Sequence, residues 1–228
     1  MTGTAINVAT VLAGTALGLA LRRKTPDRMA HTVVQGVGVF TIFIGMSMAL
    51  ETKDVLVALF SMAIGSAVGT AVDIEGWLER TASRVEARFA RGESGTLARG
   101  FIASSLLFCV GPMAILGSIQ DGLTGDYRLL VTKAIMDGFC SIAFAATLGI
   151  GVALSAGVIL VYQGTLTLAA TGIKAFLSDA AVREMTAVGG LLIVGIGVDM
   201  LGIKKIHVAN MLPAIAVALL LARVALRA

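Results

Sequence analysis

The sequence predicts an all-α membrane protein, a polytopic bundle of about eight transmembrane helices. Hydrophobic residues make up 57% of its 228 residues and the mean hydropathy is +0.93, whereas a typical soluble domain is roughly 45–50% apolar. Charged residues are only 14% of the chain, which is about half of the usual share. The apolar residues also gather in runs of about 20, the length that crosses a bilayer as a helix.

Eight apolar segments follow one another along the chain. Arg22-Arg23-Lys24 and Pro26 end the first segment, and the link 51–54 joins the second and third into a hairpin. The apolar run 129–171 is too long for one span, so we divide it at Gly149-Ile-Gly151. A single long, bent helix is the alternative there and would give seven spans. The expected spans are 4–21, 30–50, 55–72, 101–119, 129–148, 152–170, 185–201 and 208–226.

The segment 73–100 differs from the spans in composition, because five arginines and four glutamates are interleaved with apolar residues. The apolar residues recur at helical spacing, opposite the charges. This pattern favours an amphipathic helix on the membrane surface, with Trp77 at the headgroup level. A solvated helical loop is the alternative.

The basic residues predict the orientation in the membrane. Eight spans place Arg22-Arg23-Lys24, the segment 73–100 and Lys204-Lys205 on one side. That side is the cytoplasm, because short cytoplasmic loops carry an excess of Lys and Arg. Both termini and the polar turn predicted at 120–128 then face out. Seven spans would place Lys204-Lys205 outside, and the rule favours eight spans only slightly.

The two ends of the chain resemble each other. Gly38 precedes Gly45 by seven residues, and Gly190 precedes Gly197 by seven; a short charged link and another apolar span follow each pair. In the eight-span count the similar segments have opposite orientations, so we predict an inverted 3+3 repeat, the plan of many secondary transporters. The chain is then one membrane domain, 1–228, whose parts are the first repeat 1–72, the amphipathic segment 73–100, the central hairpin 101–149 and the second repeat 150–228.

Gly111-Pro112 interrupts the fourth span. Proline removes a backbone donor, and a break in a membrane helix is tolerated where protein or water satisfies the freed groups. We therefore predict that this break, with Gln120 and Asp121 nearby, helps to bind a small solute. Asn210-Met-Leu-Pro213 would supply a second break. The alternative is that Pro112 only kinks the span to fit its neighbours.

Polar side chains within the spans are the other candidates. Lys133 and Asp137 are four residues apart and share a helix face, so they can pair; the pair would either line a pathway or only lock helices together. Carboxamides can both donate to and accept from an ion or polar solute. The candidate pathway residues are Asn7, Gln35, Pro112, Gln120, Asp121, Lys133, Asp137, Gln163 and Asn210.

The sequence contains no pattern that indicates an enzyme, and we expect no cofactor and no bound metal. It lacks a Ser/His/Asp or Cys/His constellation, a phosphate-binding glycine loop and metal-ligand spacing. Cys109 and Cys140 lie inside apolar spans and are expected to be small buried hydrophobes. The net charge of +4 comes from short loops between spans, so it does not indicate nucleic-acid binding.

Several strings resemble the YqgA/YdfK family of bacterial inner-membrane proteins, which is a domain-of-unknown-function family. They are Gly3-Thr-Ala-Ile-Asn7, Phe108-Cys-Val-Gly-Pro-Met-Ala-Ile-Leu-Gly-Ser-Ile-Gln-Asp-Gly-Leu123, Lys133-Ala-Ile-Met-Asp-Gly138, Tyr162-Gln-Gly164 and Val208-Ala-Asn-Met-Leu-Pro-Ala214. The resemblance spans essentially the whole chain. It implies a multi-pass protein of the bacterial cytoplasmic membrane without a soluble domain, and it implies no substrate, cofactor or catalytic residue.

We therefore predict a small transporter or channel for an ion or small polar solute. The alternative is a non-transporting membrane protein that acts as a scaffold or through partners or lipid, in which the polar residues join helices to each other. The expected partners are the lipid bilayer and an unidentified small solute or ion. The sequence is equally compatible with a homodimer and with a monomer.

Overall fold

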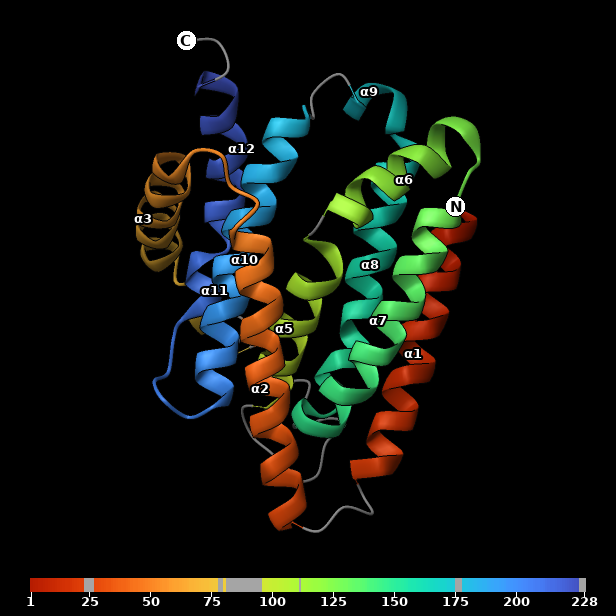
Figure 1. The fold of residues 1–228 in the computed structure, drawn as a ribbon, viewed down its shortest axis with the longest axis vertical. Helices are drawn as coiled ribbons and strands as arrows, with labels where there is room; N and C mark the ends of the chain where they lie inside the picture. Colours follow the sequence, from red (N-terminus) through yellow and green to blue (C-terminus); the bar gives the residue numbers. More distant parts are fainter. Residues whose placement is uncertain (23–26, 78–79, 81–95, 111, 175–177, 226–228) are drawn as a thin grey trace. The chain divides into compact units, whose positions relative to one another are not determined.

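The fold is known from a computed structural model, which describes residues 1–22, 27–77, 80, 96–110, 112–174 and 178–225 (Figure 1). In those ranges every regular element is a helix. The helices are α1 (Thr2–Arg22), α2 (Asp27–Ala49), α3 (Val55–Val72), α5 (Thr96–Cys109), α6 (Pro112–Thr124), α7 (Arg128–Leu148), α8 (Gly151–Leu168), α9 (Ala170–Lys174), α10 (Asp179–Met200), α11 (Val208–Met211) and α12 (Pro213–Ala225).

The predicted all-α membrane fold is confirmed. Six of the described helices are long and apolar enough to cross a bilayer, namely α1, α2, α3, α7, α8 and α10. The helices α5 and α6 form a seventh candidate, with an angle of 57° between Leu97–Cys109 and Met113–Thr124, if the broken pair is one span. The last apolar stretch, Val208–Ala222, is shorter and is divided between α11 and α12 at Pro213.

The helix boundaries follow the chemistry of the sequence. The span predicted at 55–72 coincides with α3. The Asp54 carboxylate caps its first turn, because Asp54 Oδ1 accepts from the Leu56 and Val57 amides. The apolar run after 129 separates into α7 and α8 at Gly149, which has a φ of 78°. Glycine adopts this backbone conformation without steric cost, so the expected dividing point is confirmed.

The polar turn between the fourth and fifth spans is shorter than the predicted 120–128. Helix α6 continues through Thr124, so Gln120 and Asp121 lie on its last turns and the link is reduced to 125–127. Gly122 suggests a turn in the sequence, yet it lies within the helix. Its missing side chain instead admits the Thr167 carbonyl of α8.

Most of the predicted amphipathic segment, at 78–79 and 81–95, lies outside the described residues. Among the described residues of this segment, Trp77 is 60% exposed, and Arg80 forms an ion pair with Asp73 at 3.1 Å.

The chain forms two compact units. Unit 1 comprises 1–37 and 92–177, and unit 2 comprises 38–91 and 178–228. Unit 2 thus combines the α2–α3 hairpin of the first predicted repeat with α10–α12 of the second. The beginning of α2 belongs to unit 1, and from Gly38 the helix belongs to unit 2.

Unit 1 is built around the contact of α1 with α7, and α8 packs against α1, α5 and α6. Helices α1 and α7 run in the same direction, because Gly3 lies against Leu130 and Gly18 lies against Ile142. The end of α6 lies beside the end of α8, where Gly122 meets Thr167. The beginnings of α1 and α7 and the ends of α6 and α8 therefore share one end of the unit, which we call the Met1 end.

In unit 2, α3 packs against α11 and α12, and α10 packs against α12 and α3. Its core includes Ala58, Val188, Ala214 and Ala218, with Met62, Met185 and Ile215 around them. Gly65 lies against Ala214 on α12 and Gly69 against Asn210 on α11, so α3 runs in the opposite direction to the stretch formed by α11 and α12. These small residues let the helix backbones approach closely.

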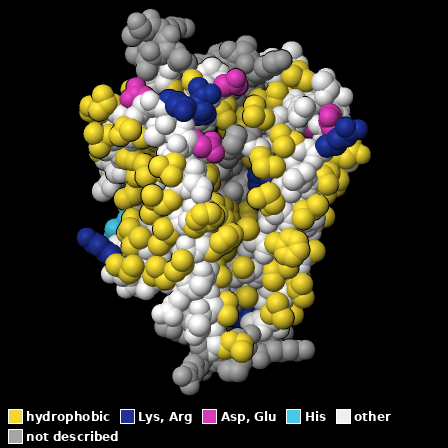
Figure 2. Space-filling model, viewed as in Figure 1, with side chains coloured by type: hydrophobic (Ala, Val, Ile, Leu, Met, Phe, Trp, Pro, Cys, Tyr) yellow, Lys and Arg dark blue, Asp and Glu magenta, His cyan; other side chains and the backbone are white. Residues whose placement is uncertain are grey.

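Large apolar side chains are exposed on the helices of both units. Examples are Leu59 on α3, which is 57% exposed, and Phe139 on α7, which is 71% exposed. Hydrophobic side chains cover most of the face seen in Figure 2, where charged side chains occur in a few small groups. Such a surface is unfavourable in water and indicates contact with the lipid bilayer.

Candidate functional site

The centre of the candidate site is an ion pair on α7. Lys133 Nζ contacts Asp137 Oδ2, as the four-residue spacing predicts. Both side chains are buried, with exposed fractions of 8% and 7%. The helical turn places them on one face, and this face points into the interior of unit 1.

Helix α1 adds a carboxamide to this pair. Asn7 is fully buried, and its Nδ2 donates to Asp137 Oδ2 at 3.0 Å. The carboxylate therefore receives the lysine ammonium and the asparagine amide at the same oxygen. The other end of the Asn7 side chain, Oδ1, has no hydrogen-bond partner among the described residues.

Further buried polar atoms lack partners in unit 1. Gln163 on α8 is fully buried, and neither its Oε1 nor its Nε2 has a hydrogen-bond partner in the part of the chain that the structure describes. The same holds for the hydroxyl oxygens of Thr4 on α1 and Thr167 on α8, which are also buried. Buried polar groups normally have a partner in the protein or in bound water.

Three of the buried polar residues lie at similar depths. Asn7 is five residues from the beginning of α1, Lys133 five from the beginning of α7 and Gln163 five from the end of α8. All three helix ends belong to the Met1 end, and a rise of 1.5 Å per residue places the three residues about 8 Å inside it. Asp137 is about 14 Å inside by the same rise. A hydrocarbon core about 30 Å thick would therefore enclose the group.

Helices α1 and α8 pack against each other in unit 1. They run in opposite directions, because α1 begins at the Met1 end and α8 ends there. Asn7 and Gln163 therefore lie at similar depths on two helices that are in contact.

Helix α5 contributes an aromatic ring and a thiol to these buried groups. The Lys133 ammonium lies over the buried Phe108 ring, 5.9 Å from its centroid, where the ring face attracts a cation. Cys109 on α5 and Cys140 on α7 are free thiols within electrostatic range of Lys133 and Asp137.

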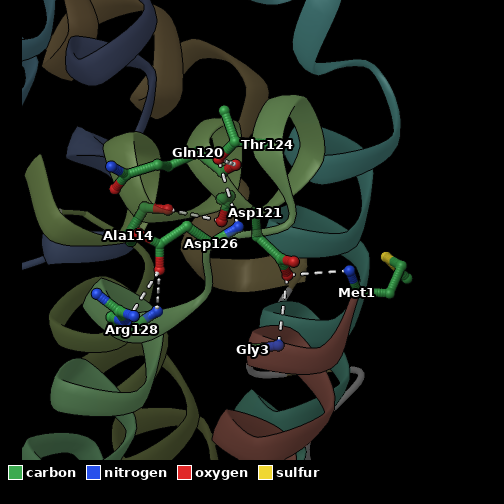
Figure 3. Close-up of polar contacts among 9 residues, drawn as sticks. Met1, Gly3, Ala114, Gln120, Asp121, Thr124, Asp126 and Arg128 are labelled. Carbon is green, nitrogen blue, oxygen red and sulfur yellow. Dashed lines mark hydrogen bonds and ion pairs between the residues drawn. The ribbon is translucent and has the colours of Figure 1, made fainter.

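Asp121 makes a different contact, at the Met1 end itself. Its Oδ2 pairs with the Met1 α-ammonium at 2.9 Å and accepts from the Gly3 amide at 3.3 Å (Figure 3). This carboxylate fastens the beginning of α1 to α6. Gln120 is exposed, and its side chain extends away from Asp121.

The remaining candidates have other surroundings. Asn210 belongs to unit 2, where its Oδ1 accepts from the Glu75 amide at 2.8 Å; Glu75 also contacts His207 Nδ1 at 2.9 Å. Gln35 is exposed on α2. Pro112 begins α6 at the predicted break. Of the nine candidates, the structure thus brings Asn7, Lys133 and Asp137 into direct contact and buries Gln163 in the same unit.

Sequence reasoning missed Thr4, Thr167 and Phe108. Threonine in a membrane helix usually bonds back to its own backbone, so the residue type alone does not indicate an unpaired hydroxyl. Spacing could have identified Thr4 and Thr167, which lie three residues before Asn7 and four after Gln163 and so share a helix face with each carboxamide.

The described residues do not gather the acidic and sulfur ligands of a transition metal at one place. Among the described residues, no group of three or more His, Cys, Asp or Glu side chains could hold a metal ion. The polar atoms in contact with Asp137 Oδ2 are instead the Lys133 ammonium and the Asn7 amide nitrogen.

Comparisons with known proteins place the chain in a family. The family described as "Protein of unknown function (DUF554)" matches residues 2–223. The chain belongs to the DUF554 family. It is 31% identical over 219 residues to the "Uncharacterized membrane protein YdfK" of Bacillus subtilis (strain 168), covering 94% of this chain and 93% of that protein.

A second DUF554 relative is the "Uncharacterized protein YqgA" of Escherichia coli (strain K12), 28% identical over 221 residues, with 95% of this chain and 94% of that protein covered. No solved structure matches the chain. The predicted family is therefore confirmed, and the chain is a membrane protein that matches these relatives over nearly their whole length.

Proposed function

We propose that the protein is a small transporter or channel for an ion or small polar solute, with its binding site inside unit 1. One observation carries the proposal: the fully buried Gln163 carboxamide has no partner among the described residues. Leaving such a group unpaired costs about 1–3 kcal/mol. A carboxamide that binds water or solute during the transport cycle avoids that cost.

The ion pair supports the same function. Charged side chains deep in a bilayer are costly, and they usually mark a substrate, ion or proton pathway. Apolar residues of similar volume would stabilise the interior of unit 1 at least as well as a buried ion pair does. Lys133 and Asp137 are therefore better explained by a role in binding than by packing alone.

The glycine contacts of unit 2 support the inverted repeat. A Cβ added to Gly45 would lie 2.7 Å from the Gly190 oxygen, and one added to Gly190 would lie 2.5 Å from the Gly45 oxygen. A Cβ on Gly197 would lie 2.9 Å from the Gly38 oxygen. Gly45 thus meets Gly190, and Gly38 meets Gly197.

This crosswise pairing is what a two-fold axis would produce. The sequence repeat aligns Gly38 with Gly190 and Gly45 with Gly197. A two-fold operation exchanges aligned residues, so a contact of Gly45 with Gly190 implies one of Gly197 with Gly38. An axis in the membrane plane would make α2 and α10 equivalent and antiparallel, which is the arrangement in many secondary transporters.

We place the protein in the bacterial cytoplasmic membrane. Its described elements are helices, whereas outer-membrane proteins typically cross as closed β-barrels. Its two relatives are bacterial. An enzymatic role is not part of the proposal.

The test is solute flux in liposomes that contain the purified protein. We expect the wild type to move at least one of a panel of common ions and small metabolites, and Asp137→Asn and Gln163→Leu to slow that flux at least tenfold. Asp126→Asn, in the link between α6 and α7, is the matched control and should keep wild-type flux. Equal flux from all four folded proteins would mean that the site does not lie in unit 1.

A scaffold is the second candidate, and one observation favours it. Two grooves of unit 1, of about 350 and 710 Å³, are apolar and include neither Asn7 nor Gln163. The first lies between α1 and α7, and the second lies along α8. If the polar centre is packed and dry, its groups only join helices. Liposomes would then show no flux above protein-free controls for any member of the panel.

A further inference from the structure

We infer that Asp137 is a binding site for a monovalent cation, at which the Lys133 ammonium and the cation replace each other. The inference rests on the proposed site and names its ligand: a hard alkali cation of the Na⁺ or K⁺ type. In the cation-free state, the Lys133 ammonium takes the place of this cation at the Asp137 carboxylate.

The ligand atoms are oxygens. Asp137 supplies a carboxylate; Asn7 Oδ1, on the side chain that donates to Asp137, and Gln163 Oε1, on α8, are buried oxygens without partners among the described residues. Hard cations bind carboxylate, carbonyl and hydroxyl oxygens. One carboxylate with several neutral oxygens balances a single positive charge, so a monovalent ion is favoured over a divalent one.

Asn7 is oriented for this role. Its Nδ2 donates to Asp137 Oδ2, which fixes the carboxamide so that Oδ1 lies on its opposite side. The bond therefore holds a carbonyl-type oxygen near the carboxylate without occupying it. An asparagine that only joined α1 to α7 would leave this oxygen as an uncompensated cost.

Lys133 occupies the position that a cation needs. Its ammonium contacts Asp137 Oδ2 directly and lies over Phe108. A lysine ammonium and an alkali cation cannot both bind one carboxylate in a buried site, because the net charge of +1 would be costly in hydrocarbon. The arriving cation is therefore accompanied by the loss of one proton from Lys133.

The exchange conserves charge and atoms. The Asp137 carboxylate releases the Lys133 ammonium and binds M⁺; the N–H bond of the ammonium breaks, its electron pair remains on Nζ, and the proton goes to bulk water or buffer. The reverse step restores the ammonium and releases M⁺. Binding of one cation thus releases one proton, which makes cation affinity increase as pH increases.

Few other titratable groups face this site. Cys140 is on α7 itself, Cys109 is on α5, and Tyr162 on α8 lies within electrostatic range of Cys109. On α6 the acidic residue Asp121 pairs with the Met1 ammonium. On α1 the described residues present Asn7 and threonines to the interior, and the charged Arg22 lies at its far end.

The first measurement is thermal unfolding of the purified protein in NaCl, KCl or LiCl, with choline chloride at equal ionic strength as the reference. We expect at least one cation to raise Tm saturably, by roughly 5 °C or more at about a hundred times its Kd. The midpoint should move to lower cation concentration as pH is raised. No rise above choline for any cation at any pH would overturn the inference.

The second measurement is proton release into weak buffer, followed with a pH indicator as the stabilising cation is added. Wild type should release about one proton for each cation bound, and Asp126→Asn should do the same. Lys133→Met should bind the cation at least as tightly and release none. Stabilisation of the wild type without proton release, or equal release from Lys133→Met, contradicts the exchange.

Asp137→Asn should abolish the Tm shift, and a shift that survives this change places the cation elsewhere. If Asp137→Asn does not fold, the wild-type proton release and the Lys133→Met comparison still decide. Liposome flux separates this inference from the proposed function: a solute flux that persists in choline, with no cation shift, retains a transporter and rejects the cation site.

Discussion

At the scale of single residues, the Lys133–Asp137 pair dominates the interior of unit 1. Both groups are buried in a segment that crosses the bilayer, and each is compensated by the other. Removing one partner leaves an uncompensated charge, which is more costly than losing the attraction itself. Single replacements at this pair should therefore lower the free energy of unfolding more than a matched double replacement would suggest.

We predict non-additive effects at this pair. Lys133→Ala and Asp137→Ala should each lower the free energy of unfolding by about 3–5 kcal/mol. The double replacement should lower it by less than the sum, with a coupling of about 0.5–3 kcal/mol. Reversible unfolding in mixed micelles measures all four proteins. Strictly additive losses would mean that the two side chains do not interact.

The sequence predicts this pair because its partners are four residues apart on one helix. It cannot predict contacts between distant residues. Asn7 meets Asp137 across 130 residues, and Asp121 meets Gly3 across 118. Hydropathy identifies Asn7 and Asp137 as polar residues within apolar spans, and only the packing of α1 against α6 and α7 decides which residues meet.

At the scale of helices, glycine decides how closely two of them approach. On α2, Gly45 lies against the backbone of α10, and a side chain there would overlap Gly190 and Val194. On the same helix, a Cβ added to Gly36 would meet no atom within 4 Å. The two glycines therefore have different roles, although both are glycines on the same helix.

We predict that Gly45→Ala destabilises the protein by about 1–3 kcal/mol, because its methyl group forces α2 and α10 apart. Gly36→Ala is the matched control and should be neutral or stabilising by up to about 1 kcal/mol, since alanine is the better helix former. Thermal unfolding of both variants compares them. A Gly45→Ala protein as stable as Gly36→Ala would exclude the close crossing.

Helix ends were predictable where a residue changes the backbone itself. Pro112, Pro213 and Gly149 each mark a boundary that the structure has. Gly122 was misleading, because glycine favours a turn as much as it favours close packing, and only the neighbouring Thr167 carbonyl distinguishes the two. The shorter link 125–127 follows from that difference.

At the scale of the whole molecule, hydropathy predicts the membrane class and most of the spans. The division into two units was not predictable, because it depends on which helices far apart in the sequence contact each other. Unit 2 contains α2 and α3 together with α10–α12, and periodicity along one segment carries no information about such pairing.

We predict the topology from the basic loops. In intact cells, a membrane-impermeant thiol reagent should label Asp126→Cys and should not label Arg80→Cys or Lys204→Cys, all in a background without Cys109 and Cys140. Lys and Arg in short loops favour the cytoplasmic side. Labelling of Arg80→Cys or Lys204→Cys without permeabilisation would reverse the orientation or change the number of spans.

Water access to Gln163 tests the central claim, that the interior of unit 1 is a solute site, most directly. In cysteine-free protein reconstituted in liposomes, Gln163→Cys should react with a small charged thiol reagent. Phe139→Cys, on an exposed apolar position of α7, should not react in the same membrane. A Gln163→Cys protein as unreactive as Phe139→Cys, while Asp126→Cys reacts fully, would contradict the claim and identify the polar centre as dry packing.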